Sequence, residues 1–66
     1  MNLLKQKVNH RLFGAGTIFA LKSNKIYVTF KKPYGDKVFP YPKVFHKDMQ
    51  LENADLQREL LETIAN

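Results

Sequence analysis

The chain has 66 residues, a net charge of +5 at pH 7, a hydrophobic fraction of 44% and no cysteine. This length fits one domain over residues 1–66, and the hydrophobic fraction is that of a folded globule. Without cysteine, disulfides, thiolate metal sites and a cysteine nucleophile are excluded. No apolar run approaches the roughly 20 residues that cross a bilayer, and Met1–Lys5 is too short and too soon charged for a signal peptide. We therefore expect a soluble, cytoplasmic protein with no membrane partner.

Charge is unevenly distributed along the chain. Residues 5–47 contain ten Lys or Arg against a single acid, Asp36, which gives a formal charge of +9. Residues 48–66 contain one basic residue, Arg58, against five acids, which gives −4. This asymmetry favours a polyanionic partner for the basic segment, although lysine-rich strands can also serve only for solubility.

The first elements along the chain are runs of β-forming residues. Lys7–His10 predicts a short strand, and Thr17–Lys22 and Lys25–Phe30 predict two longer ones. The residues between the last two runs, Ser23-Asn24, predict a tight hairpin turn, because Asn tolerates a positive φ.

The third of these runs has the clearest period in the sequence. Ile26, Val28 and Phe30 alternate with polar residues and therefore share one face of the strand. We expect this face to line the core, which places Tyr27 on the opposite, outward face.

The middle of the chain is broken up by proline and glycine. Lys31–Asp36 is expected to be a loop, and Lys37–Phe39 a short strand that ends at Pro40 or lies at a sheet edge, because proline cannot donate to the ladder. Tyr41–Phe45 is expected to form a single helical turn with Pro42 at its start. Such a turn would bring its last residue onto the core.

The final segment changes to a helical period. Asn53 is a suitable N-cap, and Asp55 suits the positive end of a helix over residues 53–65. The apolar stripe of this helix consists of Leu56, Leu60, Leu61 and Ile64. Because so short a helix is marginal alone, we expect the stripe to pack on the strands, with a partner protein as the alternative cover.

Together these elements predict a mainly β fold. We expect a small SH3-like (Tudor-like) barrel of four to five antiparallel strands over residues 6–47, followed by a C-terminal α-helix over residues 53–65.

Two glycines lie close together before the second predicted strand. A phosphate-binding loop would need a lysine after its last glycine, or a third glycine, with a helix to follow. Here Gly14-Ala15-Gly16 leads into β-forming residues. We therefore interpret the glycines as a sharp bend that passes close to another backbone. Phe13 is expected to plug one end of the barrel, and His10 to brace the bend.

The segment Val8-x-His10-x-x-Phe13-Gly14-x-Gly16-Thr17-Ile18, followed by Ile26-x-Val28-x-Phe30, resembles the Tudor-like barrel at the C-terminus of bacterial UvrD/PcrA-type DNA helicases. It is more distantly similar to the N-terminal barrel of CarD-type transcription regulators. Residues 37–45 resemble small barrel modules of bacterial and phage proteins. The resemblance covers residues 7–47, without the helicase motor. It implies a module that docks on RNA polymerase, other proteins or nucleic acid.

The sequence offers little for catalysis. Asp36 is the only carboxylate of the basic segment, and Ser23 lies where a turn favours serine. The two histidines, His10 and His46, lie far apart in sequence, and neither has a histidine three or four residues away. We expect His46 to be exposed. We therefore expect no enzymatic activity, no metal site and no cofactor.

Exposed aromatic residues among lysines are typical of nucleic-acid binding, because bases stack on rings while Lys and Arg follow the phosphates. Phe19 is expected either outside or under the helix. The candidate binding residues are Arg11, Lys22, Lys25, Tyr27, Lys31, Lys32, Tyr34 and Lys37. If the hairpin turn and the following loop lie side by side, most of them form one basic patch.

Two function classes remain open. The first is a DNA- or RNA-binding barrel. The second is a protein-interaction module, such as a phage-type inhibitor of a host enzyme, that docks by a strand edge or by the leucine stripe. RNA polymerase or another nucleic-acid machine would suit such a module. The chain would be a monomer, or a weak homo-oligomer through its helix.

Overall fold

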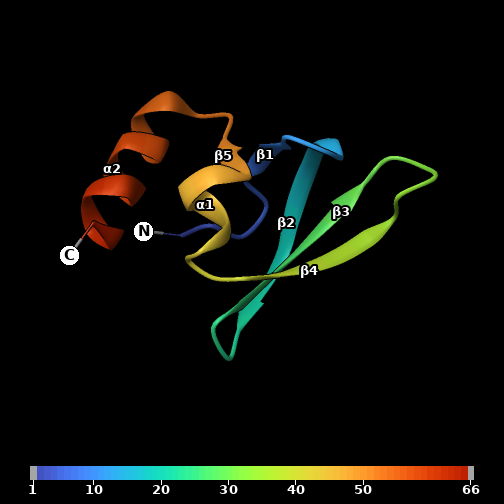
Figure 1. Cartoon of the computed structure of the whole chain (residues 1–66), viewed down its shortest axis with the longest axis horizontal. Coiled ribbons are helices and arrows are strands. Elements are labelled where there is room, and N and C mark those ends of the chain that lie inside the picture. Colours follow the sequence, from blue (N-terminus) through green and yellow to red (C-terminus); the bar gives the residue numbers. More distant parts are fainter. Residues whose placement is uncertain (1, 66) are drawn as a thin grey trace.

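The computed structural model describes residues 2–65, which form five strands and two helices (Figure 1). In chain order these are β1 (Lys7–His10), β2 (Gly14–Lys22), β3 (Lys25–Phe30), β4 (Asp36–Pro40), α1 (Val44–Lys47), β5 (Met49–Leu51) and α2 (Ala54–Ile64). The predicted fold class is confirmed as mainly β, with five antiparallel strands and a C-terminal helix. Neither described helix is long and apolar enough to cross a membrane.

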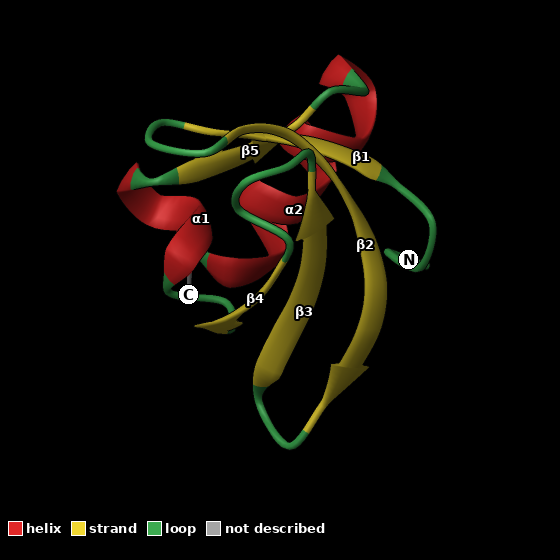
Figure 2. Ribbon diagram, turned by 90° about the vertical axis from the view of Figure 1, so that its right-hand side faces the viewer, coloured by secondary structure: helices red, strands yellow, loops and turns green. Residues whose placement is uncertain are grey.

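The five strands form one bent sheet in the order β4-β3-β2-β1-β5 (Figure 2). Within residues 2–65 the pairing ends at β4 and β5, so the sheet is open and these two are its edge strands. The strands extend to Leu51, beyond the range 6–47 expected for the barrel, because β5 pairs with β1. The position of Pro40 at the end of an edge strand agrees with the prediction, since this residue has no N–H to offer a neighbour.

One core lies on the concave face of the sheet, and it contains the predicted inward row. Ile26, Val28 and Phe30 are all buried. The whole cluster comprises Leu3, Val8, Ile18, Ile26, Val28, Phe30, Val44, Phe45, Met49, Leu51 and Leu60. Because the alternate residues of β3 point away from this cluster, the convex face of the sheet is open to solvent.

The predicted hairpin between β2 and β3 is confirmed. Ser23 and Asn24 both have a positive φ, of 53° and 61°, which is the geometry of a two-residue turn whose twist matches its strands. In Figures 1 and 2 this turn projects from the rest of the molecule.

A β-bulge interrupts β2. Ile18 pairs with Val28, but the next partner of β3, Tyr27, pairs with Ala20. Phe19 is therefore the extra residue, and the bulge reverses which side chains of β2 face the core beyond this point.

The two glycines lie at the start of β2 rather than between strands as predicted, and each position requires glycine for a different reason. Gly14 has a φ of +78° and open space around it. A Cβ on Gly16 would lie 2.7 Å from the Phe30 ring and 2.8 Å from Val28. The sequence predicts a close approach to another backbone, but the close approach is to side chains of β3.

The chain between β4 and β5 makes the expected helical turn. The Phe45 N–H donates to the Pro42 carbonyl at 2.9 Å, and Phe45 is buried. The helix itself begins two residues after Pro42, at Val44, so Pro42 precedes α1 rather than starting it.

Helix α2 begins as the sequence predicts, with the Leu56 N–H donating to the Asn53 side chain at 3.0 Å. Leu60 is buried in the core, while Leu61 from the same predicted stripe is 42% exposed. The Gln57 side chain accepts a hydrogen bond from the Leu51 N–H at 2.7 Å, so α2 covers part of the β5 edge.

Candidate functional site

Apart from Arg11, the predicted binding residues divide between the two ends of β3. Five residues on the convex face near the β2–β3 turn are defined here as the hairpin surface: Phe19, Lys22, Lys25, Tyr27 and Val38. Across the strands, Tyr27 lies opposite Val38 of β4, and Lys22 lies opposite Lys25. Phe19 and Val38 are 48% and 51% exposed, Tyr27 is half-buried, and both lysines are exposed.

The rings and the ammonium groups of the hairpin surface lie within reach of one another. The ring centroids of Phe19 and Tyr27 are 6.0 Å apart, with an angle of 56° between their planes. The Lys22 Nζ lies 5.5 Å from the Tyr27 ring centroid, a cation–π distance. Aromatic, aliphatic and cationic groups therefore share one solvent-facing area.

The bulge at Phe19 creates this grouping. A regular strand would alternate from the buried Ile18, which would turn Lys22 towards the concave face. With one extra residue, Ala20 and Lys22 lie on the convex face with Tyr27. The outward position of Phe19 was one of two expectations. The position of Lys22 beside Tyr27 depends on a register that the sequence does not reveal.

The other predicted aromatic residue lies at the opposite end of β3. Tyr34, in the β3–β4 loop, is 44% exposed and lies 5.1 Å from the Phe13 ring. The Lys37 Nζ lies 5.2 Å from the same Phe13 ring. Lys31 and Lys32 are exposed on the same loop.

The single basic patch is therefore not formed. The β2–β3 turn and the β3–β4 loop lie at opposite ends of β3 (Figure 1), and six residues of strand span about 17–20 Å. Lys22, Lys25 and Tyr27 belong to one end, whereas Tyr34 and the remaining lysines belong to the other.

Apart from Tyr34, the rings at the loop end are packed against one another, and Phe39 reaches them from the concave face of β4. The His10 ring is stacked on Phe39 at 4.8 Å and lies 4.8 Å from Phe13. Phe30 lies 5.4 Å from Phe13 and 6.1 Å from Phe39. Phe13 therefore closes this end of the sheet, which is the plugging role that the sequence predicted.

His10 braces the turn that follows β1. Its Nδ1 accepts a hydrogen bond from the Leu12 N–H at 3.1 Å, and its side chain is buried. Burial lowers the pKa of His10 below its ordinary value, and the positive charge of Arg11 acts in the same direction, whereas the Asp48 carboxylate opposes both. The neutral form is therefore favoured, which fits a structural acceptor. His46, by contrast, is exposed as predicted.

Arg11 is paired with an acidic residue. Its Nε donates to the Asp48 carboxylate at 2.5 Å, and its backbone N–H donates to the Asp48 carbonyl at 2.8 Å. The hydrogen bond from Arg11 lowers the pKa of Asp48. This pair joins the end of β1 to the start of β5, and its positive charge is locally neutralised.

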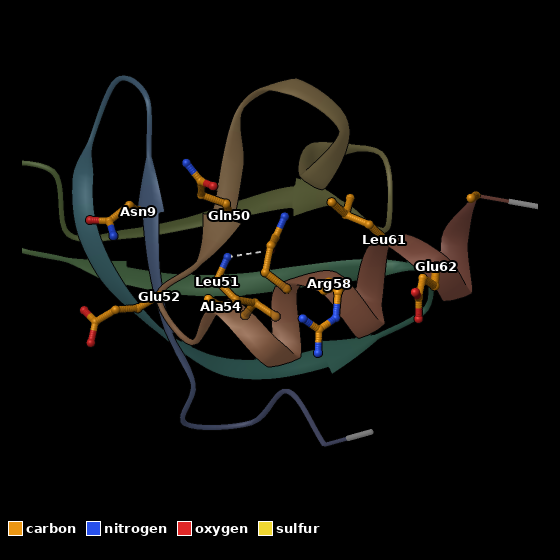
Figure 3. A pocket seen from close by; sticks show the side chains of 10 residues that line it. Asn9, Gln50, Leu51, Glu52, Ala54, Arg58, Leu61 and Glu62 are labelled. Carbon is orange, nitrogen blue, oxygen red and sulfur yellow. Dashed lines mark hydrogen bonds between the residues drawn. The ribbon is translucent and has the colours of Figure 1, made fainter.

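A groove that the sequence did not predict runs between β5 and α2 (Figure 3). It has a volume of about 630 Å³, and its lining includes Asn9, Gln50, Arg58, Leu61 and Glu62. The only signal in the sequence was Leu61, which extends the apolar stripe beyond the part that the core covers.

Over residues 2–65, no group of three His, Asp or Glu side chains is arranged to hold a metal ion. Comparison of the chain with protein-family models, curated proteins and solved structures gave no match.

Proposed function

We propose that the protein is a nucleic-acid-binding module that uses the hairpin surface. The observation that carries this proposal is an exposed ring, Phe19, next to the half-buried ring of Tyr27 and beside two exposed lysines. Rings of this kind offer stacking area to bases, and lysines neutralise phosphates. A small module with these groups on one open face can hold a polyanion without a deep cleft.

The distribution of charge over the fold supports this orientation. All nine lysines lie within residues 5–47, whereas α2 carries Asp55, Glu59 and Glu62 against Arg58. The acidic helix lies apart from the projecting β2–β3 turn (Figure 1). A polyanion is therefore attracted to the sheet and repelled by the helix.

The strand order, with a helical turn before the last strand, also supports the proposal of an SH3-like or Tudor-like module. Such folds host many unrelated functions. The fold class is therefore compatible with nucleic-acid docking but gives it no independent weight, and the assignment depends on the hairpin surface.

The test is a titration of labelled oligonucleotides at about 50 mM and about 200 mM salt. We expect affinity to fall at least about tenfold between the two, because each neutralised phosphate releases counterions. Lys22→Ala/Lys25→Ala should weaken binding about fivefold at the lower salt concentration. The matched control is Lys31→Ala/Lys32→Ala, which removes the same charge at the other end of β3. Equal losses in both variants would contradict the hairpin surface as the site.

A second candidate function is protein docking in the groove between β5 and α2. The specific observation is Leu61, an exposed apolar residue within the groove. Partners recovered from a nuclease-treated bacterial lysate would support it if Leu61→Glu abolished recovery and Lys22→Ala/Lys25→Ala did not. Sedimentation of the pure protein tests self-association through the same helix, and a monomer at high concentration would exclude it.

A further inference from the structure

We infer that the hairpin surface binds unpaired bases, so that its ligand class is single-stranded rather than double-stranded nucleic acid. This inference rests on the proposed function and adds the state of the ligand. It follows from the way in which the two rings are presented.

The Phe19 ring is exposed and the Tyr27 ring is half-buried, and the two are close enough for one nucleic-acid strand to contact both. Phe19 is 48% exposed, and its centroid lies 6.0 Å from that of Tyr27. Their planes are inclined by 56°, so they offer two differently tilted surfaces rather than one flat platform. A flexible single strand can turn successive bases onto such surfaces, whereas a duplex keeps its base faces stacked inside the helix.

The backbone around the rings fixes their positions. Phe19 is held by the bulge between two ladder pairs, Ile18 with Val28 and Ala20 with Tyr27. Tyr27 lies in the middle of β3 between strands on both sides. A binding surface on strands loses less conformational entropy than one on a mobile loop.

The two lysines lie next to the rings, where the backbone of a bound nucleic-acid strand would continue past them. Lys22 and Lys25 face each other next to the turn, and the Lys22 ammonium lies over the Tyr27 ring. When a base takes that place on the ring, we expect the ammonium to move to a neighbouring phosphate. Val38, opposite Tyr27, adds an apolar floor that contributes nothing to phosphate binding. A surface that contacts only the phosphates of a duplex would gain no affinity from this apolar side chain.

The rings at the other end of β3 provide an internal control. Tyr34 is exposed to a similar extent as Phe19, and it also has lysines nearby. Its ring, however, contacts Phe13, which is packed against the core, whereas Phe19 and Tyr27 contact each other outside the core. We therefore expect Tyr34→Ala to leave single-strand affinity within about twofold of the parent.

The experiment compares an oligothymidylate of about ten nucleotides with a duplex of the same length, by fluorescence anisotropy at low salt. We expect the duplex to bind at least about fivefold more weakly. Phe19→Ala and Tyr27→Ala should each weaken single-strand binding at least about fivefold, and Tyr34→Ala is the control. Because Tyr27 is half-buried, Phe19→Tyr and Tyr27→Phe are measured as well. Both keep a ring and should keep the affinity.

Tyrosine emission gives a direct readout of stacking. The chain has three tyrosines and no tryptophan, so tyrosine dominates its fluorescence. We expect oligothymidylate to quench the parent and Tyr34→Phe, and to quench Tyr27→Phe much less at the same occupancy.

The outcomes separate the inference from the proposed function. Equal binding of both oligonucleotides, sensitive to the lysine variant but not to the ring variants, would overturn the inference and leave the proposed function standing. The same holds for quenching that persists in Tyr27→Phe. No binding of either oligonucleotide at low salt would overturn both proposals and favour a protein ligand.

Discussion

The two ends of β3 have nearly the same composition and opposite organisation. Each has aromatic residues and several lysines close in sequence. The rings of His10, Phe13 and Phe30 contact one another at the loop end, and Phe39, which pairs opposite Ile26, stacks on His10 across the concave face. At the hairpin end Phe19 and Tyr27 lie on the convex face, outside the core.

The difference shows that aromatic residues among lysines do not by themselves identify a binding surface. What distinguishes the ends is register, because the residues of β3 alternate between the faces and the bulge shifts those of β2. A ring that faces the core contributes to stability, and a ring on the other face is available for a ligand. Stability measurements can therefore test this contrast independently of binding.

The largest expected contrast is between Phe30→Ala and Phe19→Ala. Phe30 is a buried core residue, and its truncation is expected to cost about 3–5 kcal/mol of unfolding free energy. Phe19 is about half exposed, and its truncation is expected to cost within about 0.5 kcal/mol. Urea denaturation measures both. Similar losses of unfolding free energy in the two variants would contradict the distinction between a ring packed in the core and a ring exposed on the convex face.

The next effect concerns the glycines at the packed end. Gly16→Ala would place a methyl group against the Phe30 ring and Val28, and overpacking of this kind costs about 1–3 kcal/mol. In Gly14→Ala the added methyl group meets open space, so only the positive φ lowers the unfolding free energy, by about 1 kcal/mol. Thermal unfolding of the two variants compares them. A Gly16 variant as stable as the parent would show that the loop end is loosely packed.

The smallest effect is the pH dependence of the unfolding free energy that His10 causes at the loop end of β3. Because burial holds the folded pKa of His10 below its ordinary value of 6.5, the unfolded chain binds a proton more readily. The stabilising contribution is present above pH 6.5 and is lost as the pH falls through this value towards the folded pKa. Asp48, the nearby carboxylate, has a lowered pKa and therefore stays charged over this range.

Urea midpoints between pH 7.5 and about pH 5 measure this slope. In His10→Asn the side-chain oxygen can still accept from the Leu12 N–H, but nothing titrates at this position, so the slope should disappear. A parent protein with a flat profile, or a variant with the same slope, would refute the structural role of neutral His10.

Much of the fold could be predicted where the cause is local. The alternation in Lys25–Phe30, the turn at Ser23-Asn24 and the cap at Asn53 each depend on neighbouring residues. β5 was not located, because Met49–Leu51 is only three residues long and its strand structure comes from pairing with β1.

The site was predictable only in part, for the same reason. The outward face of Tyr27 follows from the period of its own strand, and it was confirmed. The distance between the β2–β3 turn and the β3–β4 loop, and the pairing of Arg11 with Asp48, depend on how distant segments meet. The roles of the candidate residues in binding stay predictions.

Helix α2 has a consequence for behaviour at high concentration. Exposed backbone groups along a sheet border invite strands of other molecules, which is the first step towards fibrils. One border ends in Pro40, which has no donor, and along the other Gln57 occupies the Leu51 N–H. The helix thus covers one donor of this border, and we expect its detachment to promote strand pairing between molecules.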